Sequence, residues 1–131
     1  MEIKIVNNFI MINDAPLEEI QIDNSKLIVL FDDFNEDRWI FKTTNIAFRL
    51  IALDYTKPSV YVIDRLNLSH GRFYKYILEI TDSPWIKELE RKSSNEPIGC
   101  FKNFHHYVLF LGDNLCEILS SDIGILKQMK P

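Results

Sequence analysis

Short apolar runs of strand length, separated by turn residues, recur along this chain and constrain it to a β-rich fold. The run Leu27–Phe31 is continuous and apolar, as expected for a strand covered on both faces. An acidic loop separates it from Arg38–Thr43, so these two segments predict a hairpin. A second hairpin is predicted in the last third, where Gly112-Asp113-Asn114 separates His106–Leu111 from Leu115–Leu119.

Five further segments carry strand signals of differing strength. Alternation or β-branched content marks the segments Ile5–Ile12, Ile46–Leu53, Ser59–Ile63, Arg72–Ile80 and Ile123–Leu126. Ile46–Leu53 also fits a helix, because Ala and Leu recur in it. We favour a strand there, since the segment continues a β-rich stretch and lacks a helix cap.

One helix is clearly indicated, over about residues 84–93. Ser83 is a good capping residue, and Pro84 suits the first helical position. Trp85, Ile86 and Leu89 then form one apolar stripe. Together these signals predict a single α+β domain over residues 1–131. We expect a mostly antiparallel, strongly bent sheet of about six to eight strands and one principal helix.

The composition is that of an ordinary globular protein. The chain has 131 residues, of which 47% are hydrophobic and 26% charged. This excludes intrinsic disorder and a fold that depends on disulfides. We find neither a signal-peptide pattern nor an apolar window long enough for a membrane helix. We therefore expect a cytoplasmic protein in which Cys100 and Cys116 stay reduced.

The net charge of −4 conceals an uneven distribution. Residues 1–40 contain nine acidic and three basic residues, which gives this segment a charge of −6. The remainder, with 12 basic and 10 acidic residues, carries +2. This balance argues against a general nucleic-acid binder and in favour of an acidic surface that a basic partner recognises.

The acidic residues are densest in the loop of the first predicted hairpin. Asp33, Asn35 and Asp37 match the start of a calcium-binding loop, but Arg38 stands where glycine is required, and Thr44 where a bidentate glutamate is required. We therefore expect no metal here. Two interpretations stay open, a solvated loop and a docking patch. The docking patch would consist of Asp32, Asp33, Phe34, Glu36 and Asp37.

A second candidate site involves the histidines near the last hairpin. His105 or His106 could act as a base together with Asp113 or Glu117. Adjacent strand residues point to opposite faces, however, so the two histidines would not easily share one metal. A pair of one cysteine with one histidine is a further alternative, although nothing nearby marks an activated thiol. Phosphate-binding glycine motifs are absent, and we expect no cofactor.

The second half of the chain resembles a group of small single-domain bacterial proteins, some of the immunity type paired with secreted toxins. The resemblance spans residues 45–126. It rests on Ile46–Leu50, on Tyr76–Ile86 with its Ser-Pro-Trp, and on His105–Leu119. It implies a protein that neutralises a toxin by binding it, and it supplies no catalytic residues.

These observations lead to three functional hypotheses. The first is an immunity-type protein that binds a basic secreted toxin, without nucleic acid or membrane as partner. The second is a small-molecule-binding or hydrolytic domain with a pocket in the bent sheet. The third is a structural subunit of a larger assembly, which an exposed apolar patch would support.

Overall fold

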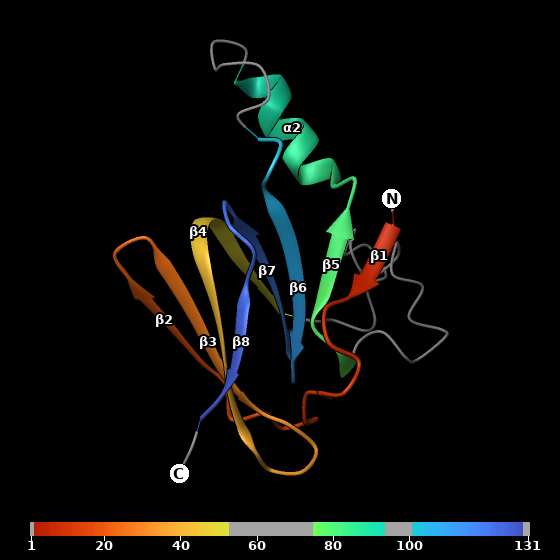
Figure 1. Ribbon diagram of the computed structural model, residues 1–131, viewed down its shortest axis with the longest axis vertical. Coiled ribbons are helices and arrows are strands. Elements are labelled where there is room, and N and C mark those ends of the chain that lie inside the picture. The colour runs from red at the N-terminus through yellow and green to blue at the C-terminus, as the bar shows by residue number, and fades with distance from the viewer. Residues whose placement is uncertain (1, 53–74, 94–100, 130–131) are drawn as a thin grey trace.

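The computed structural model of the protein describes residues 2–52, 75–93 and 101–129. In these ranges the chain forms an eight-stranded sheet and one helix, with every strand pairing antiparallel (Figure 1). The elements in chain order are β1 (Glu2–Ile5), β2 (Glu19–Asp23), β3 (Lys26–Asp32), β4 (Arg38–Ala52), β5 (Leu78–Thr81), α2 (Pro84–Lys92), β6 (His105–Leu111), β7 (Asn114–Ser120) and β8 (Ile125–Gln128). The predicted α+β class with one principal helix is confirmed. The strong bend of the sheet stays a prediction.

The long strand β4 joins the two parts of the sheet. Its first half pairs with β3 along one edge and with β8 along the other. From Asn45 onward it pairs instead with β7, and this pairing contains a register shift between Asn45 and Ala47. The sheet order is therefore β1-β5-β6-β7-β4-β3-β2, with β8 beside β4 (Figure 1).

The main core lies between side chains of β3 and β4 and side chains of β6 and β7. Leu27, Val29 and Phe31 alternate along β3 and are fully buried, as the period of a strand requires. They belong to one cluster with Tyr107, whose ring meets the Phe41 ring edge-on at 5.0 Å. A smaller cluster, which includes Leu78 and Val108, packs on the other face of β5 and β6.

Both predicted hairpins are present. The ambiguous segment Ile46–Leu53 is strand as far as Ala52, since it continues β4. The turn between β6 and β7 has two residues rather than the predicted three, with Gly112 at a φ of 66°. Such a positive φ at the first turn position is typical of a tight hairpin that needs glycine.

Two predicted strands are shorter than expected, and one strand was missed. Of the predicted strand Ile5–Ile12, only Ile5 is strand, at the end of β1 (Glu2–Ile5). In the described part of Arg72–Ile80, only residues 78–80 are strand, within β5. The strand β2 was not predicted, although Ile20 and Ile22 alternate in it with polar residues, because two apolar residues in five are a weak signal. The predicted strand Ser59–Ile63 lies outside the described residues.

Helix α2 follows β5 at one end of the sheet (Figure 1). Ser83 caps it, since its hydroxyl oxygen accepts a hydrogen bond from the Ile86 N–H at 3.2 Å. Arg91 and Lys92 lie in its last turn, where they suit the negative end of the helix dipole. In the described ranges no helix has the length and apolar character needed to cross a membrane.

The loop between β7 and β8 is held against the core at Gly124. A Cβ atom at this position would overlap the Phe41 ring, and the Gly124 N–H donates a hydrogen bond to the Tyr107 hydroxyl at 2.7 Å. The substitution Gly124→Ala should therefore lower the free energy of unfolding by about 2 kcal/mol. Urea unfolding measures this, with Ile123→Ala, at an exposed neighbour, as the control. Equal stabilities of the two variants would contradict the packing described here.

Candidate functional site

The turn between β3 and β4, which we call the acidic tip (residues 33–37), is built around the Asp33 side chain. One Asp33 carboxylate oxygen accepts the backbone N–H groups of Asn35 at 2.8 Å and Asp37 at 2.9 Å. The other accepts the Trp39 indole N–H at 2.8 Å. Asp33 is only 5% exposed. The sequence suggested that Asp33 faces a partner, but its buried carboxylate instead organises the turn.

Backbone hydrogen bonds fix the acidic tip from both sides. Within the turn, the Asp33 N–H donates to the Asp37 carbonyl oxygen, and the Glu36 N–H donates to the Asp33 carbonyl oxygen. From outside, the Phe34 N–H donates to the Met11 carbonyl oxygen, and the Asn13 side chain donates to the Asp33 carbonyl oxygen. The tip is thus anchored to residues that precede β2, and its shape does not depend on a ligand.

The five residues predicted to face a partner divide into two groups. Asp32 forms an ion pair with Arg38 at 3.0 Å, and Arg38 also donates a hydrogen bond to the Leu17 carbonyl oxygen. Asp32 therefore helps to hold the base of the turn, as Asp33 holds the turn itself. Phe34, Glu36 and Asp37 are exposed. Neither exposed carboxylate forms an ion pair with any residue that the structure describes.

Local geometry determines how the exposed residues are presented. Glu36 has a φ of 65°, a conformation that most side chains avoid, and the hydrogen bonds of the turn maintain it. The Phe34 ring is 42% exposed and lies 5.1 Å from the Lys75 ammonium. The acidic tip therefore presents two carboxylates and one aromatic ring from a fixed backbone.

The carboxylate of Asp33, the first residue of the sequence match to a calcium-binding loop, is already used in protein hydrogen bonds. Both Asp33 carboxylate oxygens are occupied by protein N–H donors. Across the described ranges there is no group of three or more His, Cys, Asp or Glu side chains suited to hold a metal ion.

His106 and Glu117 of the second predicted site belong to a chain of hydrogen-bonded polar groups on the sheet face that carries α2, which we call the buried polar chain. Ser83, His106 and Glu117 are its buried members, and Arg49, whose side chain is 43% exposed, forms its outer end. His106 Nδ1 lies 2.7 Å from the Ser83 hydroxyl, and His106 Nε2 lies 2.9 Å from Glu117. Arg49 Nε reaches the other Glu117 oxygen at 2.6 Å from the facing position of β4. Trp85 covers this buried polar chain, with its ring against both His106 and Arg49.

The hydrogen bonds among Ser83, His106 and Glu117 are mutually compatible if His106 carries its proton on Nε2, a tautomer inferred from the pattern of hydrogen bonds. Nε2–H then donates to Glu117, and the Ser83 hydroxyl donates to Nδ1 while accepting the Ile86 N–H. Burial raises the pKa of Glu117, but the hydrogen bonds from His106 and Arg49 outweigh it and hold the pKa below its ordinary value. Glu117 is therefore a carboxylate that is fully paired inside the protein.

The buried polar chain resembles a serine–histidine–acid triad in composition, but its geometry favours a structural role. Ser83 is 4% exposed and His106 1%, so a substrate cannot reach the hydroxyl. Pro84 follows Ser83 and has no N–H to offer a developing oxyanion. The Ser83 oxygen already caps α2. We conclude that these residues fasten α2 to the sheet.

The other residues of the predicted pocket lie elsewhere. His105 points to the opposite face of β6, where it meets Glu79 at 2.8 Å and stacks on Tyr107. Asp113 lies in the turn between β6 and β7, at the end of the hairpin remote from His106. The structure thus brings His106 and Glu117 together, and leaves His105 and Asp113 apart from them.

The cysteine alternative finds no support at Cys116, which lies on β7. Burial, with a contribution from the neighbouring Glu117, raises the pKa of the Cys116 thiol to about 12. The thiol therefore stays protonated and unreactive at neutral pH. Cys100 lies outside the described residues.

Two members of the buried polar chain, Arg49 and Ser83, were not predicted as site residues. A signal for Arg49 existed, since it is a single charged residue between Phe48 and Leu50 in a strand. Ser83 was recognised only as a helix cap.

Comparison with protein-family models, curated proteins and solved structures finds no match for this chain.

The pairing of Glu117 predicts a pH-dependent contribution to stability. Because its pKa is lowered in the folded protein, this contribution is complete above the unfolded value of about 4.3 and disappears as the pH falls through the folded value. At pH 7, Glu117→Gln should lower the free energy of unfolding by about 2 kcal/mol. The loss should shrink steadily below about pH 4.3.

Urea unfolding at several pH values measures this dependence. Glu90→Gln, at an exposed position on α2, is the matched control and should change stability by less than about 0.5 kcal/mol. A stability loss for Glu117→Gln that stays constant down to acid pH would show that the Glu117 carboxylate is not the stabilising group.

Proposed function

We propose that this protein binds a basic protein partner through Phe34, Glu36 and Asp37 of the acidic tip. We further propose that the partner is a secreted toxin, neutralised in the cytoplasm, as the resemblance to immunity-type proteins implies. The observation that carries the proposal is the Asp33 carboxylate, which holds the turn open to solvent in a fixed conformation.

A fixed turn favours binding because little conformational entropy is lost when the partner docks. Exposed carboxylates attract a basic surface, which speeds association and sets orientation more than it raises affinity. Phe34 adds an aromatic ring of the kind that anchors interfaces. Phe34, Glu36 and Asp37 are exposed on the same short turn, so one partner surface can contact all three side chains.

The alternative of a hydrolytic or ligand-binding pocket in a strongly bent sheet has less support. His106 and Glu117, the residues it needs, are buried and fully hydrogen-bonded. The groove that the structure does describe lies on another face and contains none of the four proposed pocket residues.

The test uses the carboxy-terminal domain of a secreted toxin encoded next to this protein's gene. Titration calorimetry measures its affinity for the native chain and for the double variant Glu36→Lys, Asp37→Lys at several salt concentrations. The double variant should bind at least about tenfold more weakly and show a smaller salt dependence. Its fold is checked by circular dichroism.

The matched control reverses two acidic residues elsewhere, Glu88→Lys and Glu90→Lys on α2. This control should bind with nearly native affinity. Unchanged affinity and salt dependence in the tip variant would remove the acidic tip from the interface. A neighbouring toxin domain that does not bind the native chain at all would contradict the immunity-type proposal.

A further inference from the structure

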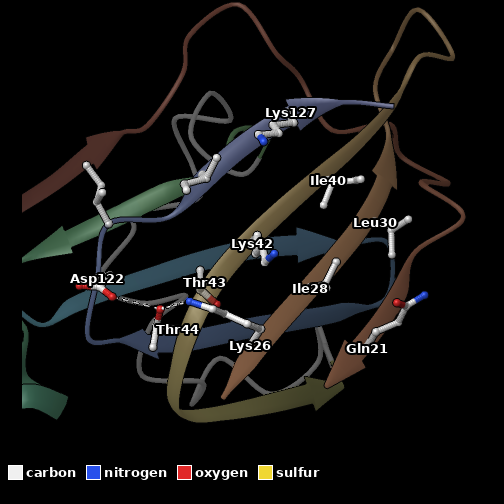
Figure 2. A pocket seen from close by; sticks show the side chains of 12 residues that line it. Gln21, Lys26, Ile28, Leu30, Ile40, Lys42, Thr43, Thr44, Asp122 and Lys127 are labelled. Atoms are coloured by element: carbon white, nitrogen blue, oxygen red, sulfur yellow. Dashed lines mark hydrogen bonds between the residues drawn. The ribbon is translucent and has the colours of Figure 1, made fainter. Parts of the chain in front are cut away.

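A groove of about 760 Å³ crosses the outer face of the four strands β2, β3, β4 and β8 (Figure 2). Ile28, Leu30 and Ile40 supply aliphatic side chains at its floor, and Lys42 and Lys127 stand beside them. This face points away from the main core, because the core residues of β3 and β4 alternate with these positions.

The strand register arranges the charges of this face in a specific order. Glu19 on β2 lies opposite Leu30, Leu30 lies opposite Ile40, and Ile40 lies opposite Lys127. Directly opposed residues of antiparallel strands share one face of the sheet. The four side chains therefore form a row, which we call the cross-strand row, that is acidic at one end, apolar in the middle and basic at the other end.

The charged ends of the cross-strand row are available to a partner. Glu19 and Lys127 are both exposed, and neither forms an ion pair with a residue in the described ranges. Lys26 differs, since its ammonium donates to Thr44, whose hydroxyl in turn contacts Asp122 (Figure 2). Ile125, on the same face, is 51% exposed, which is high for an isoleucine within a strand.

We propose that this face binds the same face of a second copy of the chain. A two-fold axis parallel to the strands, between Leu30 and Ile40, would place β2 of one copy over β8 of the other. Each Glu19 would then face a Lys127 of the second copy, and each Leu30 would face an Ile40. The row is thus complementary to itself under a rotation that closes a dimer.

Other occupants fit the face less well. The groove lining contains no aromatic ring on which a nucleic-acid base could stack, and the acidic strand β2 borders it. A small ligand is usually enclosed on most sides. This groove instead spreads over four strands, as a protein surface would require.

The size of the face predicts a weak dimer. Four strands spaced by about 4.8 Å, each presenting roughly five residues, span about 300 Å² of sheet per copy. A standard stable interface buries about 800 Å² per partner. We therefore expect a dissociation constant on the order of 100 µM at low salt, which weakens as salt screens the Glu19–Lys127 contacts.

The test is a charge exchange followed by sedimentation equilibrium. Glu19→Lys and Lys127→Glu should each raise the dimer dissociation constant by about tenfold, because each variant places two like-charged pairs in its own dimer. An equimolar mixture of the two variants should regain association at nearly native strength, since in the mixed dimer every contact again joins opposite charges. Circular dichroism confirms that both variants fold.

The controls change charge next to the row or far from it. Glu18 precedes β2, and Lys4 lies on β1 at the other edge of the sheet. The variants Glu18→Lys and Lys4→Glu should therefore each leave the dissociation constant within about twofold of the native value. A native chain that stays monomeric up to about 1 mM overturns the proposal. A mixture of Glu19→Lys with Lys127→Glu that fails to associate overturns it as well.

Discussion

The structure depends on the continuity of strand β4. Over 15 residues it pairs first with β3 and β8 and then, from Asn45 onward, with β7. This single strand brings Phe41 of the first half against Tyr107 of β6. The same strand also links the acidic tip to the buried polar chain. Arg38 begins the strand beside the acidic tip, and Arg49, near the other end of the strand, forms an ion pair with Glu117.

The polar residues serve two different purposes. Ser83, His106 and Glu117 are residue types that often act in catalysis. Here they are buried and form hydrogen bonds with one another. A buried polar chain of this kind favours a single arrangement of helix and sheet, because any other arrangement would leave a buried polar group without a hydrogen bond and so raise the free energy of the folded state. The residues proposed to meet a partner lie instead on the β3–β4 hairpin and on the strands beside it. The proposed binding surfaces are therefore separate from the buried polar chain.

Local signals were sufficient for the elements that carry them. The apolar run Leu27–Phe31 and the Ser83-Pro84 cap are readable within a few residues, and both predicted elements are present. Strand β2 has only two apolar residues, Ile20 and Ile22, and although they alternate with polar ones, a pattern of five residues is a weak local signal. Its position is set by pairing with β3, which is a tertiary effect.

The sites were harder to predict than the fold, because they depend on register. The approach of Arg49 to Glu117 follows from pairing between strands 68 residues apart in sequence. The row from Glu19 to Lys127 likewise requires the registers of three strand pairs. Burial of Asp33 could not be deduced from its acidic neighbours, since composition does not tell which carboxylate turns inward.

We propose that the Asp33 carboxylate holds the acidic tip in the conformation that binds a partner before any partner arrives. Amide hydrogen exchange of Asn35 and Asp37, measured by NMR on the free protein, tests it most directly. Both N–H groups donate to Asp33, so both should exchange at least about tenfold more slowly than in an unstructured peptide, although their residues are exposed. Exchange at the rate of an unstructured peptide would contradict the claim.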